Sequence, residues 1–126
     1  MKITTFDDLE VYKLAREFRK KMYEIAKSLP KFEEYNLANQ MRRASLSVTN
    51  NIAEGYGRYH YQENIQFCRQ SRGSISELID DLNTYIDKGY IETKSCSEFK
   101  EEAYTLIKVL NSYIASLKRL KDAVLR

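Results

Sequence analysis

The spacing of apolar residues constrains this chain more than any other feature of its sequence. In four segments, apolar side chains recur at alternating intervals of three and four residues, which is typical of an amphipathic helix that buries one stripe. The chain has only four glycines and one proline among its 126 residues, so little interrupts these segments. This pattern predicts long helices and argues against a fold of many strands and turns.

We expect one domain over residues 1–126, built from four helices joined by short connections. The expected helices cover about 7–29, 34–54, 61–88 and 97–125. Short connections make consecutive helices antiparallel neighbours. The sequence therefore predicts an all-α, antiparallel up-down-up-down four-helix bundle.

Several residues mark the ends of these helices. Pro30 ends the first helix, Gly55 and Gly57 supply the stop after the second, and Gly89 suits the left-handed position after the third. The first helix can be capped by Thr5 or Asp7.

The fourth segment has its own start signal and the longest apolar stripe. Ser95 and Glu98 have the spacing of a capping box at its start. Its apolar stripe continues to Leu120 and Val124, so we expect both of these residues to be buried.

The second helix carries two further faces beside its buried stripe. The stripe itself consists of apolar residues at helical spacing: Leu37, Met41, Ala44, Val48 and Ile52. We place Arg42, Leu46, Thr49 and Ala53 on the opposite side of the helix. Small and apolar residues there allow another helix to approach, so Leu46 and Ala53 are candidates for a subunit interface. The alternative is that they are scattered surface residues, which are common.

Charged residues on the second and third helices leave two interpretations open. Arg43 and Glu54 lie on the polar flank of the second helix, and Arg72 interrupts the apolar stripe of the third. These residues can form a salt-bridge network that holds one end of the bundle, or a cluster that contacts an anion.

Basic residues gather on two other surfaces. Lys13, Arg16 and Lys20 face away from the buried stripe of the first helix, and Lys118 and Arg119 lie near the end of the fourth. Either group can be a solvated face or a track for a phosphate backbone. The net charge of +3 permits an anionic partner without demanding one.

The connection between the second and third helices is rich in aromatic residues, with the sequence YGRYHY at positions 56–61. Tyrosines beside an arginine can stack on unpaired bases, or they can pack between subunits. The sequence does not separate these alternatives.

Few residues of the chain suit catalysis or metal binding. His60 is the single histidine, and Cys68 and Cys96 lack the spacing of metal ligands. There is no phosphate-binding glycine loop and no nucleophile with a partnering base. We therefore expect no enzyme activity, no cofactor and no metal site. The sequence lacks an apolar leader or membrane span, so we expect a cytoplasmic protein with free thiols.

Motifs between Leu29 and Leu78 point to one bacterial family. The most specific is the string NIAEGYGR at residues 51–58, followed on the next helix by Gly73-Ser74 and Glu77-Leu78. In these motifs the chain resembles the bacterial four-helix bundle proteins named after the 23S rRNA intervening sequences in which some members are encoded. One related branch looks like the accessory variability protein of diversity-generating retroelements.

The resemblance implies a ring-like homo-oligomer, a pentamer, and it carries family motifs over to this chain. Three arginines match the basic motif of the family: Arg42, Arg43 and Arg58. Four residues match its turn motif, whose role could be wholly structural: Asn51, Glu54, Gly55 and Gly57. In the retroelement branch, a basic pentameric barrel binds nucleic acid and a reverse transcriptase.

Two functions follow as hypotheses. The first is an oligomeric module that binds structured RNA or DNA through its basic surface, as an accessory to a reverse transcriptase or an rRNA-linked element. The second is a structural or protein-interaction scaffold that binds no nucleic acid. Steep salt dependence of nucleic-acid affinity would distinguish the first from the second.

Overall fold

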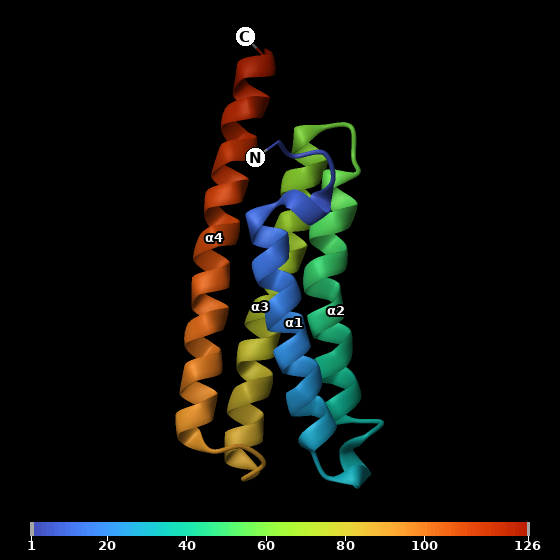
Figure 1. The fold of residues 1–126 in the computed structure, drawn as a ribbon, viewed down its shortest axis with the longest axis vertical. Coiled ribbons are helices and arrows are strands. Elements are labelled where there is room, and N and C mark those ends of the chain that lie inside the picture. Colours follow the sequence, from blue (N-terminus) through green and yellow to red (C-terminus); the bar gives the residue numbers. More distant parts are fainter. Residues whose placement is uncertain (1, 126) are drawn as a thin grey trace.

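The structure is a computed structural model that describes residues 2–125, and this part of the chain is helical throughout apart from short connections (Figure 1). It contains four α-helices: α1 (Glu10–Ser28), α2 (Leu37–Tyr56), α3 (Tyr61–Asp87) and α4 (Thr93–Leu125). Two 3-10 turns cover Phe6–Asp8 and Lys31–Glu33. The all-α class and the four helices predicted from apolar spacing are confirmed. The first and last residues of the expected 1–126 domain lie outside the described part.

The four helices surround one apolar core. α1 and α3 each pack against both α2 and α4. In Figure 1 the chain descends along α1 and α3 and returns along α2 and α4. Each helix contributes its apolar stripe to the core. One fully buried side chain from each helix, in chain order, is Met22, Met41, Ile75 and Leu110.

Two predicted helix ends are confirmed. α1 stops at Ser28, ahead of Pro30, whose ring cannot continue a helix. Gly89 follows α3 with φ of +74°, and the N–H of Tyr90 donates to the carbonyl of Tyr85 over 2.8 Å. This is the left-handed helix termination that glycine favours.

The predicted start of the first helix is wrong by three residues. α1 begins at Glu10, after the separate 3-10 turn. The carboxylate of Asp8, rather than Asp7, accepts hydrogen bonds from the backbone N–H groups of Thr4 and Thr5. These bonds close the turn, so the helix starts only after it.

The predicted starts of the second and fourth helices are also wrong. α2 begins at Leu37 rather than residue 34, because Lys31–Glu33 forms its own 3-10 turn. α4 begins at Thr93, so Ser95 lies inside its first turn and is not a cap. The reason is Cys96, which is fully buried and places its Sγ 3.6 Å from the carbonyl oxygen of Leu82 on α3.

Gly55 has a different role from the stop signal that we predicted. It lies inside α2, which runs two residues beyond the predicted end at residue 54. A Cβ atom on Gly55 would lie 2.7 Å from Asn64 Oδ1 and 3.1 Å from the backbone oxygen of Asn64. Glycine is needed here because α3 approaches α2 closely. Gly57 ends the helix with ordinary right-handed geometry, at φ of −74°.

The last two apolar positions of the predicted α4 stripe are not buried. Leu120 is 47% exposed and Val124 is 73% exposed. α4 is 33 residues long against 27 for α3, and Figure 1 shows its C-terminal turns projecting beyond the other helices. Leu120 borders a surface hollow with Tyr61 of α3, and Val124 borders another with Tyr61 and Gln62, so the start of α3 lies beside both residues without covering them.

The close approach at Gly55 gives a stability prediction with an internal control. We expect Gly55→Ala to destabilise the fold by about 1–3 kcal/mol, because the new methyl group must displace Asn64. Gly73 is also helical, but a methyl group added there would meet no atom within 4 Å, so Gly73→Ala should stabilise by about 0.5–1 kcal/mol. Urea unfolding of both variants tests this. A Gly55→Ala variant as stable as the parent would contradict the packing argument.

Candidate nucleic-acid interface

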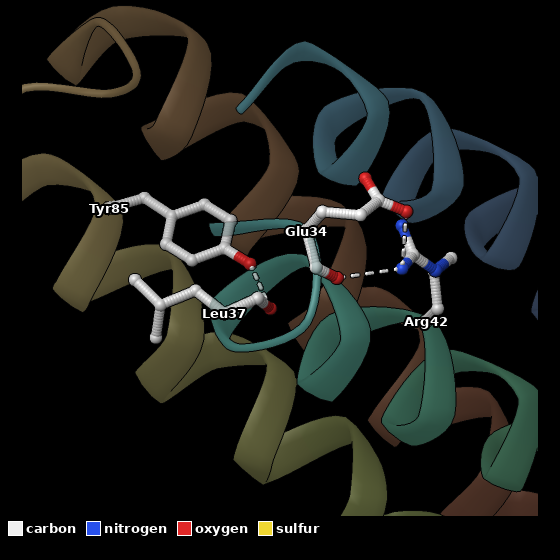
Figure 2. A network of polar contacts seen from close by, with 4 residues as sticks. All are labelled: Glu34, Leu37, Arg42 and Tyr85. Carbon is white, nitrogen blue, oxygen red and sulfur yellow. Dashed lines mark hydrogen bonds and ion pairs between the residues drawn. The ribbon is translucent and has the colours of Figure 1, made fainter. Parts of the chain in front are cut away.

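Arg42 is held at the start of α2 by contacts within the chain. Its Nη2 atom donates to both the backbone oxygen and the Oε1 atom of Glu34, each over 3.0 Å (Figure 2). Beside it, the hydroxyl of the buried Tyr85 donates to the carbonyl of Leu37 over 2.9 Å, which ties α3 to the same turn. Arg42 therefore closes the α1–α2 connection, and its charge already has a carboxylate partner.

Arg58 has two carboxylate partners, whereas Arg42 has one. Its guanidinium lies 3.5 Å from Glu54 and 3.7 Å from Glu63. It also sits over the ring of Phe67, with 4.8 Å between the guanidinium carbon and the ring centroid. Two carboxylates and an aromatic face fix this arginine between α2 and α3.

The other candidate cations divide into paired and free residues. Lys20 contacts Glu17 on the same helix over 3.1 Å. The remaining five are exposed and form no ion pair within residues 2–125: Lys13, Arg16, Arg43, Lys118 and Arg119. These five are the residues whose charge is available to a phosphate.

The candidate cations do not converge on one site. Lys13 lies near the start of α1, Lys118 and Arg119 near the end of α4, and Arg58 in the α2–α3 connection, whereas Arg42 and Arg43 lie near the start of α2. Figure 1 shows that the first three segments share the end of the bundle where α4 projects, and that α2 starts at the opposite end. The two groups are on the order of 20 Å apart along the helix axes. Any nucleic acid that contacts both groups must follow the length of the molecule.

Each position of the turn motif carried over from the family resemblance has a structural role. Asn51 lies within α2, and its Nδ2 donates to the carbonyl and the Oγ of Ser47 over 2.8 and 2.9 Å. Glu54 pairs with Arg58, and Gly57 caps the helix. Gly55 has no side chain, which allows α3 to pack closely against α2. These contacts explain the motif without a ligand.

The outer face of α2 differs in part from the prediction. Leu46 is 40% exposed and Ala53 is half-buried, as expected for an outward face. Thr49, however, is buried, because Arg19 of α1 reaches across and donates to its Oγ1 over 2.8 Å. Leu46 lies at a surface hollow of about 440 Å³ shared with Tyr23 of α1.

The structure does not form the salt-bridge network that we considered for the second and third helices. Glu54 pairs with Arg58, and Arg72 donates from Nη1 to Asn111 Oδ1 of α4 over 2.7 Å. Arg43 has no ion-pair partner in the described part of the chain. The guanidinium of Arg72 is thus hydrogen-bonded to an amide at the edge of the bundle. The charge of Arg43 stays available to a ligand.

The titratable groups with shifted pKa values do not form a reactive pair. Burial raises the pKa of the Cys68 thiol to about 12, so this thiol stays protonated. Burial, with the negative charges of Glu77 and Asp80, raises the pKa of Asp81 to about 6. The buried Oδ2 of Asp81 accepts no hydrogen bond from any described residue. Within residues 2–125, no three His, Cys, Asp or Glu side chains are grouped to bind a metal ion.

The motifs of α2 and α3 belong to a known protein family. The family model for the 23S rRNA-intervening sequence protein matches residues 7–112. The chain belongs to this family. A comparison with curated proteins gave no match. Within residues 2–125, no helix is long and apolar enough to cross a membrane.

Sequence reasoning missed several polar contacts that hold the family fold together. Glu33 is buried, and its carboxylate accepts the hydroxyl of Tyr90 over 2.7 Å and the Nδ2 of Asn36 over 3.1 Å. Tyr85 is fully buried and lies seven residues after Leu78, so helical spacing could have identified it. No local signal marks Glu33, because its partner lies 57 residues away.

The raised pKa of Asp81 predicts that the stability of the fold depends on pH. Its pKa is about 6 in the folded chain and about 4 when unfolded, so between these values the folded chain keeps a proton that the unfolded chain loses. The free energy of unfolding therefore falls as pH rises through this interval. We expect Asp81→Asn to be more stable than the parent at neutral pH by about 1 kcal/mol, an amount reduced by partial solvent screening.

This advantage should disappear below about pH 3, where Asp81 is protonated in both states. The exposed neighbour Asp80 provides the matched control, since Asp80→Asn should change stability little at either pH. Thermal unfolding across this pH range measures both variants. An Asp81→Asn advantage that does not vary with pH would contradict the assignment.

Proposed function

We propose that the chain is an antiparallel bundle that assembles as a ring-like homopentamer and binds structured RNA or DNA, without catalysing a reaction. The observation that carries the proposal is the set of free cations. Each of the described helices α1, α2 and α4 presents at least one exposed Lys or Arg that no carboxylate neutralises, as in Arg16, Arg43 and Arg119. Such residues supply most of the affinity for a phosphate backbone.

The family and the charge support this proposal together. The family description refers to 23S rRNA intervening sequences. Each chain carries a net charge of +3, and a ring multiplies this charge around one axis. Because the free cations lie toward both ends of the bundle, a ligand that contacts all of them follows the long axis. A reverse transcriptase is the protein partner that the resemblance to the retroelement branch suggests.

The proposed subunit interface is the outer face of α1 and α2. Leu46 and Tyr23 are 40% and 37% exposed and border one hollow, with Ala53 two turns further along α2. Apolar side chains grouped on an outward face are typical of a surface that another subunit covers.

The second candidate function is a scaffold that binds a protein and no nucleic acid. Two of the three arginines of the family motif favour it, because Arg42 and Arg58 are already paired with carboxylates. Under this hypothesis the same α1–α2 face meets a different protein.

Arg43 and Arg42 separate the two functions. We expect Arg43→Ala to weaken binding of fluorescent structured RNA and to lower the slope of log affinity against log salt by about one. Arg42→Ala is the control, and it should affect affinity less because Glu34 already pairs with this arginine. Absence of binding even at low salt would favour the scaffold.

Leu46 tests the assembly. We expect Leu46→Glu to convert the oligomer to smaller species, because a charge cannot be buried between subunits without a partner. Tyr104→Glu is the control, since Tyr104 is 52% exposed on α4, away from the proposed interface. The mass of both variants is measured by light scattering, with helical content checked in parallel. A Leu46→Glu variant with the parental mass would exclude this interface.

A further inference from the structure

The end of the bundle where α4 projects contains the largest hollow described on the surface. It has a volume of about 580 Å³ and lies between the N-terminal segment, the α2–α3 connection and α4. Its walls are largely aromatic and aliphatic, with Tyr56, Tyr59, Tyr61, Tyr113, Leu117 and Leu120 among them. This volume is in the range of sites that hold small organic groups.

Two of the aromatic rings of this groove are exposed to solvent, and two pack partly against the core. Tyr59 is 92% exposed, and its ring lies perpendicular to that of His60, with 4.8 Å between the ring centroids. Tyr61 is 37% exposed at the first residue of α3. Deeper in the groove, Tyr113 is half-buried and its hydroxyl accepts a hydrogen bond from Asn64 Nδ2 over 3.2 Å. The groove thus has exposed aromatic rings at its edge and the polar groups of Asn64 and Tyr113 at its base.

A cation lies beside these rings, and it forms no ion pair within residues 2–125. A second hollow, of about 350 Å³, is lined by His60, Tyr61 and Lys121 and so adjoins the groove. Lys121 Nζ donates to the neutral amide of Gln62 over 2.8 Å, which positions the ammonium and leaves its charge in place. Lys118 lies one turn earlier on α4, exposed and unpaired within the described residues.

We propose that this groove binds unpaired nucleotides of a single-stranded RNA, with a base stacked on Tyr59 and its phosphate beside Lys118 and Lys121. The inference rests on the nucleic-acid binding proposed above and specifies the form of the ligand. Bases in a duplex are stacked on each other and cannot reach an exposed ring, whereas unpaired bases can. Aromatic rings beside cations are the combination that binds single strands without reading sequence.

The charge of the rim favours this ligand over an apolar partner. A helix of another protein docked in the groove would bring its own apolar stripe against Leu120 and Val124, and it would also have to cover Lys121. A nucleotide places its base on the rings and its phosphate on the lysine, so both kinds of side chain find a partner. The polar floor at Asn64 and Tyr113 also suits the edge of a base.

The test compares matched tyrosines at the two ends of the bundle. Tyr59 and Tyr35 are 92% and 93% exposed, and only Tyr59 borders the groove. The probe is a fluorescent unstructured RNA of about ten nucleotides, and its duplex with the complementary strand is the second ligand. Anisotropy titrations with the intact oligomer measure affinity, and light scattering measures its mass.

We expect the parent to bind the single strand more tightly than the duplex at equal salt. Tyr59→Ala should weaken single-strand binding about tenfold, Tyr59→Phe should retain it because stacking needs the ring alone, and Tyr35→Ala should leave it unchanged. None of the three tyrosine variants should alter duplex binding or the mass of the oligomer.

Three outcomes would overturn the inference. If Tyr59→Ala and Tyr35→Ala bind RNA alike while Arg43→Ala still weakens binding, the groove is not the site and the proposed function stands. If the parent binds neither RNA form, both proposals fail. If Tyr59→Ala lowers the mass of the oligomer, a second copy covers the groove instead.

Discussion

The fold depends on how closely α2 and α3 approach each other. At one end, Gly55 leaves no room for even a methyl group beside Asn64. Further along, Ser71 Oγ donates to the carbonyl of Val48 over 2.7 Å, and the hydroxyls of Ser47 and Ser74 lie 2.9 Å apart. Small residues let the backbones approach, and their hydroxyls satisfy the polar groups that become buried there. This contact fixes the α2–α3 connection, and with it the aromatic residues that border the groove.

The paired state of Arg58 follows from the same geometry. Because α2 and α3 meet closely at this end, Glu54 and Glu63 converge on Arg58 from two helices. The arginine then lies over the ring of Phe67 with 43% of its side chain exposed, so its charge is shared between these partners and the solvent. A residue that looks like part of a basic motif in the sequence becomes part of the packing. Arg43 forms no ion pair within the described residues, so it keeps its charge.

The helices could be predicted well from the sequence, because the spacing of apolar residues that marks a helix is visible within a few neighbouring turns. Met41, Val48 and Ile52 repeat at helical spacing, and all three are buried as expected. Two of the wrongly predicted boundaries involve residues whose partners lie far along the chain. In the 3-10 turn before α2, Glu33 accepts a hydrogen bond from Tyr90, and in the first turn of α4, Cys96 contacts the carbonyl of Leu82. No window of neighbouring residues contains either pair.

The candidate site was less predictable for a related physical reason. Spacing places Lys13 and Arg16 on an outward face, and it cannot tell a free cation from a paired one when the carboxylate comes from another helix, as it does for Arg58 and Glu63. Likewise, helical periodicity assigns Leu120 and Val124 to a buried stripe, because periodicity continues whether or not a neighbouring helix is present. Their exposure arises from the unequal lengths of α3 and α4. The groove spans both parts of α4, because Val109, Tyr113 and Leu117 lie in the length that packs against the bundle and the exposed Leu120 lies where that packing ends. The mismatch in helix length therefore extends the groove beyond the packed bundle, at the end that carries Tyr59.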